Sequence, residues 1–82
     1  MQARVSQHGK GFHDARYRAL IEKLIEARKI QALSQDSLAS LLNRHQQFVS
    51  RYEIGERRLD IVEFVDVAQA LGLDASDLIK GL

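Results

Sequence analysis

The sequence predicts an all-α fold of five helices. Apolar residues recur at intervals of three and four positions, which is the period of a helix and not of a strand. The chain contains no proline, and no β-branched alternation indicates a strand. Residues typical of helix N-caps precede the apolar runs, and asparagine or glycine follows several of them. We expect one domain at residues 14–82, preceded by a flexible N-terminal arm at residues 1–13.

The first two helices are predicted at residues 14–30 and, from an N-cap at Ser34, up to Asn43. Leu33 and Leu38 flank the start of the second helix as a hydrophobic staple. In the first helix, the residues at helical spacing are Tyr17, Leu20, Ile21, Leu24, Ile25 and Arg28. In the second, the expected buried stripe consists of Leu38, Leu41 and Leu42.

The third helix is predicted from near His45 to about Glu53, with Val49 and Tyr52 buried and Gly55 as the stop signal. Asp60 and Asp74 are the N-caps of the last two helices, and Gly72 ends the fourth. Glu63 completes a capping box with Asp60; the staples are Leu59 with Phe64 and Leu73 with Leu78. The expected core face of the fourth helix is Ile61, Phe64, Val65, Ala68 and Leu71.

Composition excludes several classes of protein. With 45% hydrophobic and 28% charged residues, the chain is typical of a folded domain. It has no cysteine, which excludes disulfides and thiolate metal sites. No apolar run approaches the roughly 18 residues of a membrane span, and the first residues lack the apolar stretch of a secretion signal. We therefore expect a cytoplasmic protein with no membrane partner.

The segment from Ser34 to Glu53 has the properties of a helix-turn-helix. Two short helices joined by a tight turn meet at a steep angle, and the small side chain of Ala39 permits their close approach. Asn43 tolerates the positive φ that the turn requires. The second helix of the pair is left with an outward polar face, formed by Gln46, Gln47, Ser50 and Arg51.

Four stretches, in their order and spacing, resemble the Cro/repressor (XRE-like) family of bacterial and phage helix-turn-helix regulators. They are residues 24–28, 33–39, 49–55 and 67–72. The resemblance covers about residues 17–80 and implies a lambda-repressor-like DNA-binding domain. It also implies that Arg28 and Glu53 form a structural ion pair between the first and third helices.

The resemblance implies a DNA-binding role for particular residues. Gln35 corresponds to a glutamine that binds a phosphate and braces the recognition helix. Gln46 and Gln47 correspond to positions that reach base edges, where glutamine suits adenine. Ser50 and Arg51 follow one turn later, and Arg51 suits guanine or a phosphate. The alternative for these positions is an ordinary solvated helix surface.

Further basic residues are expected at phosphates. Arg44 stands where many members of the family have an apolar residue, so it is expected to be more exposed. His45 stands where many have a Ser or Thr cap, and its imidazole is expected to cap the helix or contact a phosphate less reliably. Arg57 and Arg58 follow the third helix and are read as phosphate contacts, or as charge that favours solubility. Lys10, Arg16 and Arg18 are candidates for a basic arm reaching the duplex, and the alternative is an ordinary basic tail.

Charge is unevenly distributed along the chain. Residues 1–58 hold eleven Lys and Arg against six Asp and Glu, a net +5, whereas residues 59–82 hold one against five, a net −4. A basic face toward phosphate would account for this polarity, as would chance. His8 and His13 are too few for a metal site without further ligands. Phe48 is expected to pack against the core or its rim.

We expect a homodimeric transcriptional regulator, a repressor, bound to double-stranded DNA. Leu78, Ile79 and Leu82 are candidates for the dimer surface, or else they close the core. No sensor domain follows the fifth helix, so control by concentration or by a partner is expected rather than by a small-molecule ligand. The alternative is a protein-interaction module, such as an antitoxin or adaptor subunit. No catalytic triad or glycine-rich phosphate loop suggests an enzyme or a cofactor.

Overall fold

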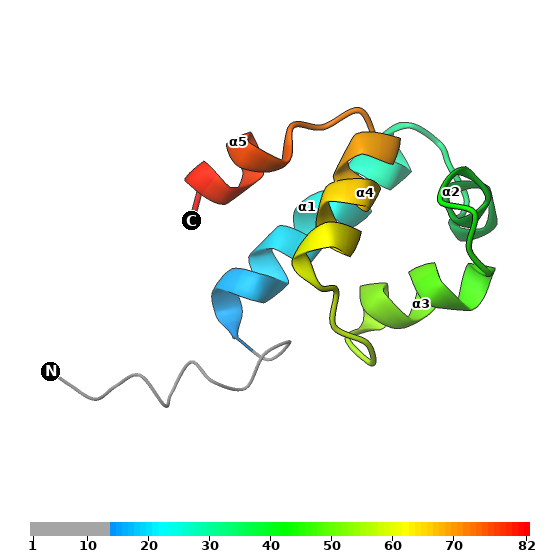
Figure 1. Cartoon of the computed structure of the whole chain (residues 1–82), viewed down its shortest axis with the longest axis horizontal. Helices are drawn as coiled ribbons and strands as arrows, with labels where there is room; N and C mark the ends of the chain where they lie inside the picture. Colours follow the sequence, from blue (N-terminus) through cyan, green and yellow to red (C-terminus); the bar gives the residue numbers. More distant parts are fainter. Residues whose placement is uncertain (1–13) are drawn as a thin grey trace, which may run out of the picture.

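The computed structural model describes residues 14–82, and this part of the chain consists of α-helices joined by turns and loops, with no strand (Figure 1). The predicted all-α class is confirmed. Residues 1–13, which include the expected arm with Lys10, His8 and His13, lie outside the described residues. The helices are α1 (Ala15–Ile30), α2 (Gln35–Leu41), α3 (Gln46–Ile54), α4 (Ile61–Ala70) and α5 (Ala75–Lys80).

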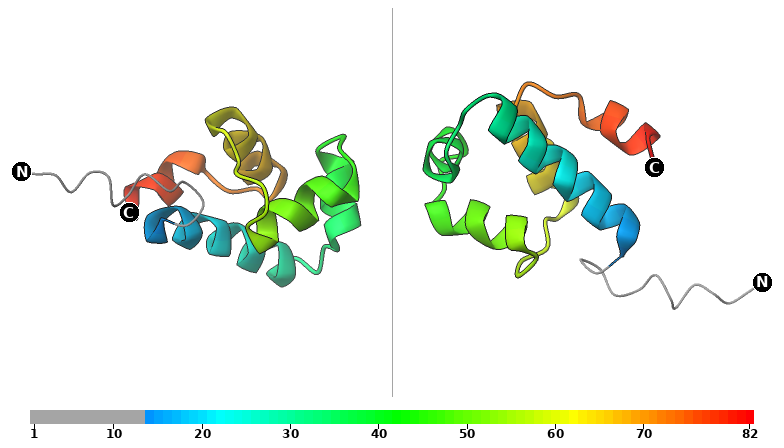
Figure 2. Two further views of the ribbon diagram at one scale, coloured as in Figure 1. Left: turned by 90° about the horizontal axis from the view of Figure 1, so that it is seen from below. Right: turned by 180° about the vertical axis from the view of Figure 1, so that it is seen from behind.

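The helix-turn-helix forms one end of the domain and α5 the other. Helices α2 and α3 contact each other extensively, and α3 also contacts α1. Helix α5 contacts α1 and α4, on the side away from α2 (Figures 1 and 2). The central helices α1 and α4 therefore connect two separate surfaces, one bearing α3 and one bearing α5.

Local sequence signals determine the helix ends. The side chain of Ser34 accepts a hydrogen bond from the Ser37 amide at 2.9 Å, as predicted for an N-cap. Asp60 and Glu63 form the predicted capping box, with distances of 2.7 Å and 3.0 Å. Asn43 has a φ of 57°, the left-handed conformation expected at the turn. Each of these predictions depended on residues within one turn of the helix end.

The core lies where α1, α2, α3 and α4 meet. Its largest fully buried side chains are Ile21, Leu24, Leu38, Val49, Tyr52 and Val67. Phe48 is also buried, as expected. In α4 the inner stripe is Phe64, Val67, Ala68 and Leu71.

Two predicted core residues are exposed. Leu41 is 61% exposed because it is the last residue of a helix with only seven residues, and the half-buried Leu42 takes the inner position beyond it. Ile61 is 65% exposed because it is the first residue of α4, and the inward face of this helix begins only at Glu63 and Phe64. The predictions of Leu41 and Ile61 as core residues were wrong.

None of the helices within residues 14–82 combines the length and the apolar character needed to cross a membrane.

Candidate nucleic-acid interface

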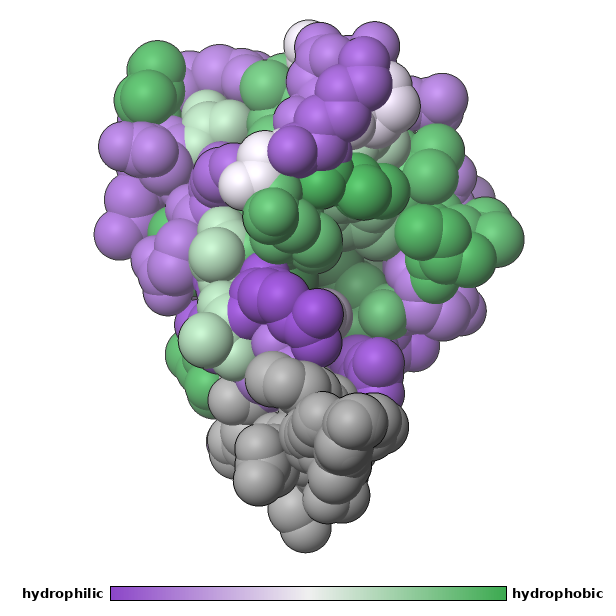
Figure 3. Space-filling view, turned by 90° about the vertical axis from the view of Figure 1, so that its left-hand side faces the viewer, coloured by the Kyte–Doolittle hydropathy of each residue, from purple (hydrophilic) through white to green (hydrophobic). Residues whose placement is uncertain are grey.

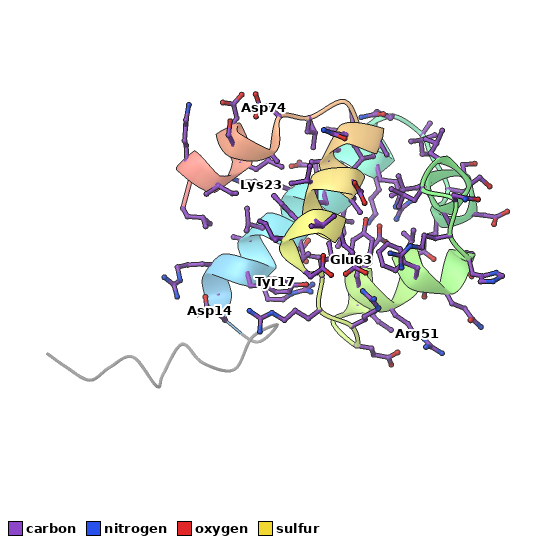
Figure 4. All side chains as sticks on the ribbon, viewed as in Figure 1. Asp14, Tyr17, Lys23, Arg51, Glu63 and Asp74 are labelled. Atoms are coloured by element: carbon purple, nitrogen blue, oxygen red, sulfur yellow. The ribbon has the colours of Figure 1, made fainter. Side chains whose placement is uncertain are left out.

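Helix α3 turns a polar side toward solvent. Its inward face is Phe48, Val49, Tyr52 and Glu53, all of them buried. Gln46, Gln47 and Arg51 are exposed and Ser50 is partly buried on the other side. Arg51 extends from α3 away from the body of the protein (Figure 4). The side of α3 that the sequence predicted as an outward face is therefore uncovered.

The inner side of α3 is fixed to α1 by a buried ion pair. Arg28 donates from Nε to Oε2 of Glu53 at 2.7 Å and from Nη2 to Oε1 at 3.0 Å. A third bond joins Nη1 of Arg28 to the carbonyl of Leu33 at 2.8 Å. The hydrogen bonds with Glu53 raise the pKa of Arg28 above its ordinary value. The ion pair that the family resemblance implied is therefore present.

A chain of hydrogen bonds leads from this ion pair to the surface. Gln35 donates from Nε2 to Oε1 of Glu53 at 2.9 Å. Its own Oε1 accepts a bond from Nε2 of Gln46 at 2.7 Å. The amide of Gln46 is thus held in one orientation, with its Oε1 left to accept a bond from outside. The side chain of Gln47 makes no such hydrogen bond within residues 14–82, so both its Oε1 acceptor and its Nε2 donors are available to a ligand.

Helix α3 starts beside His45, as predicted. His45 is the N-cap, but its side chain makes no capping hydrogen bond, in agreement with the poor capping expected of imidazole. Gln46 and Gln47 are the first two residues of the helix. The amide groups at the start of a helix lack intrahelical partners and attract anions. The exposed His45 lies beside this end.

Arg44 and Arg57, on opposite sides of α3 in the sequence, meet at one carboxylate. Arg57 donates to both oxygens of Glu63, at 2.9 Å and 2.8 Å, and Arg44 donates to Oε2 at 3.2 Å. Both guanidinium carbons lie over the ring of Phe48, at 4.4 Å for Arg44 and 4.9 Å for Arg57. These two expected phosphate contacts are therefore not isolated cations, although their side chains remain about 40% exposed (42% and 39%).

Glu63 was recognised in the sequence only as a capping residue. Its charge at the third position of α4 gave no indication that arginines distant in sequence would converge on it. Arg57 lowers the pKa of Glu63 to about 2, because its hydrogen bonds favour the charged carboxylate. Arg58 lies near the ring of Tyr17, with 5.9 Å from its guanidinium carbon to the ring centroid.

Arg16 and Arg18 do not belong to an arm. Both lie in the first turns of α1. Arg16 pairs with Asp14 at 3.0 Å, and Arg18 bonds to Glu22 and to the carbonyl of Glu53, both at 3.2 Å. The arm considered for them in the sequence would have to end before α1, because Asp14 caps α1 ahead of both residues.

Known proteins share this arrangement. A helix-turn-helix family model matches residues 24–78, about two thirds of the chain. An XRE-family-like protein from Pseudomonas syringae pv. tomato is 45% identical, with a TM-score of 0.80 and 84% of each chain covered. The chain belongs to the XRE-type helix-turn-helix family. The restriction-modification controller protein C.AhdI from Aeromonas hydrophila is 30% identical, with a TM-score of 0.65 over 78% of this chain and 97% of that chain. A comparison with curated proteins finds no match.

Membership of the XRE-type family gives the site its general function. The family consists of DNA-binding transcription regulators, and the matched region includes all of α2 and α3. The XRE-type protein described here is accordingly a DNA-binding regulator whose helix-turn-helix is α2 and α3.

Proposed function

We propose that this protein recognises a specific double-stranded DNA sequence by placing α3 in the major groove. The uncovered polar side of α3, with Gln46 held in place through Gln35, carries the proposal. An α-helix fits the major groove, where each base pair presents a distinct pattern of hydrogen-bonding groups. The side-chain amide of Gln46 is already oriented before DNA binds, which reduces the conformational entropy lost on binding.

Each exposed polar residue then has a separate role. Gln46 and Gln47 are proposed to bind base edges, preferably of adenine, because an amide can accept from N6 and donate to N7. Ser50 and Arg51 meet bases or phosphates one turn further along the groove. The residues proposed to bind phosphates are Gln35, Arg44, His45, Arg57 and Arg58.

An apolar surface formed by the start of α4 and the end of the chain supports a homodimer. Ile61 and Val62 at the start of α4 and Ile79 and Leu82 near the end of the chain are exposed, and we term these four residues the apolar end. Figure 3 shows apolar surface gathered on this side of the molecule. Ile61 and Ile79 line a hollow of about 220 Å³ together with Tyr17, Leu20 and Arg58. Leu78, which was expected at the dimer surface with Ile79 and Leu82, is half-buried and packs against the core. We therefore leave it out of the proposed dimer surface.

A second copy seated on the apolar end would give a dimer whose two α3 helices remain free for DNA. Dimers of this type bind two half-sites about 34 Å apart on one face of the duplex. Two recognition helices double the number of base contacts, which a single small domain lacks. We further propose that the dimer represses transcription, because a protein that occupies a DNA site excludes other proteins from it.

The dependence of DNA binding on salt tests this function. Fluorescence anisotropy with a labelled mixed-sequence duplex, from 50 to 300 mM salt, should show the logarithm of the affinity falling linearly with the logarithm of the salt concentration, with a slope of about −0.9 for each phosphate that the protein neutralises. Arg51→Ala should bind more weakly, whereas the control Lys29→Ala, at the exposed end of α1, should bind as the wild type does. A duplex affinity that is absent at low salt would favour the protein-interaction module instead.

A further inference from the structure

One carboxylate connects the two ends of the recognition helix. Arg44 precedes α3, Arg57 follows it, and both donate to Glu63 on α4. The three side chains come from segments that are separated by 13 and 6 residues in the chain, so their meeting is a property of the tertiary fold. Glu63 lies between α4 and α3 in Figure 4.

The hydrogen-bonding capacity of Glu63 is filled by these contacts. Its Oε1 accepts from Arg57 and from the Asp60 amide, and its Oε2 accepts from Arg57 and Arg44. Its side chain is only 10% exposed. A carboxylate oxygen accepts about two bonds, so the group is saturated and cannot itself contact DNA.

The two arginines keep donors for a further ligand. A guanidinium has five N–H donors in a rigid plane. Arg44 uses one of them on Glu63, and Arg57 leaves its Nε unused. The ring of Phe48 supports both planes, so their directions are restricted as well as their positions. With two cations and one anion, the cluster keeps a net positive charge beside α3.

We propose that Glu63 is a positioning residue of the DNA interface, which holds Arg44 and Arg57 side by side, ready to bind the DNA backbone next to α3. This inference rests on the proposed function. Long side chains lose conformational freedom when they bind a ligand, and Glu63 imposes that order before DNA arrives. It would do so at the expense of one negative charge near a polyanion.

That charge allows a test in which the sign of the effect is decisive. If Glu63 only neutralises the arginines, Glu63→Gln removes a negative charge and DNA binding strengthens. If Glu63 positions them, Glu63→Gln weakens binding by about tenfold, as expected for loss of one charge-assisted bond. The logarithmic salt slope should also fall in magnitude by about one for each phosphate contact that is lost.

Asp66→Asn is the matched control. Asp66 lies about one turn further along α4 and is exposed. It lines a small hollow between α3 and α4 together with Arg44, Phe48 and Glu63. Its substitution changes the net charge equally and should leave affinity equal or slightly higher. Both variants would be measured on the full chain by anisotropy at several salt concentrations, below their melting temperatures. Tighter binding by Glu63→Gln, or an unchanged salt slope, would overturn the inference.

Arg57→Lys decides the matter if Glu63→Gln does not fold. The substitution keeps the charge, but an ammonium cannot bind both oxygens of a carboxylate in the planar arrangement of arginine. Weaker binding by about tenfold supports positioning, and wild-type affinity contradicts it. Failure of the wild-type protein itself to bind DNA would instead refute the proposed function, so the two failures are distinguishable.

Discussion

Arg28 and Glu53 join α1 to the inner side of α3 by two hydrogen bonds, of 2.7 Å and 3.0 Å, in the interior of the protein. The same carboxylate supports Gln35, which in turn holds Gln46. A structural ion pair and the proposed base contact are therefore parts of one hydrogen-bonded chain. Changes in the ion pair should affect both stability and DNA recognition.

Glu53→Gln should lower the free energy of unfolding by about 3–5 kcal/mol, because the charge of Arg28 would be left buried without its partner. Replacing both residues, in Arg28→Met with Glu53→Met, should recover most of this loss, since no buried charge remains. Urea denaturation of the wild type, Glu53→Gln, the single variants Arg28→Met and Glu53→Met, and the double variant measures the differences in the free energy of unfolding. A double variant less stable than either single variant would contradict this account.

Gln47→Ala should relax the preference at one base position per half-site, with a loss of about 1–3 kcal/mol for the preferred base. The amide of Gln47 is unbraced and exposed, so its removal should leave the fold intact. Affinity for a panel of single-base variants of the bound site provides the measurement. Gln69→Ala, an exposed glutamine on α4, is the control. An unchanged preference would show that Gln47 does not contact a base.

Tyr52→Phe should leave stability unchanged or raise it by up to about 1 kcal/mol. The hydroxyl of Tyr52 is fully buried and has no hydrogen-bond partner in the structure, and burial raises its pKa. Removing an unpaired polar group eliminates its desolvation cost while the ring continues to pack on Phe48, 5.6 Å away. Thermal unfolding would measure the change. A loss above 1 kcal/mol would mean that the hydroxyl has a partner.

Stability should fall in acid in a way that depends on Glu63. Its pKa is about 2 in the folded protein, below the ordinary value of 4.5, because Arg57 and Arg44 favour the charged form. Its contribution is thus complete above about pH 5 and is lost as pH falls toward 2. The stability difference between wild type and Glu63→Gln should shrink from on the order of 3 kcal/mol at pH 6 toward zero at pH 2. Parallel pH profiles would contradict this assignment.

Ile61→Lys should weaken the dimer, because it places a charge in the apolar end. Ile30→Lys is the matched control, since Ile30 is equally a highly exposed isoleucine but lies at the far end of α1. Sedimentation equilibrium over a range of protein concentrations should show a larger dissociation constant for Ile61→Lys alone. Equal dimerisation of the two variants, or a monomeric wild type, would place the dimer surface elsewhere or exclude it.

Much of the fold could be predicted because the signals are local. The caps at Ser34, Asp60 and Asp74 and the positive φ of Asn43 depend on the few residues around each helix end. The exposure of Leu41 and Ile61 could not be predicted, because both satisfy the helical spacing and only the absence of a covering neighbour leaves them at the surface.

The proposed site shows the same limit. The outward polar side of α3 could be predicted from the helical spacing of its apolar residues, and the Arg28–Glu53 ion pair could be predicted from the family resemblance. The convergence of Arg44 and Arg57 on Glu63 did not, because their identities as exposed basic residues suggested independent phosphate contacts. Which charges share a partner is determined by the tertiary fold.

Selection of bound fragments from a random duplex pool tests the central proposal most directly. We expect the wild-type protein to enrich a two-fold symmetric site, with half-sites separated by about 10 base pairs, one turn of the duplex. Recovery of unselected sequence after repeated rounds, with no common site, would contradict the placement of α3 in the major groove as a sequence reader.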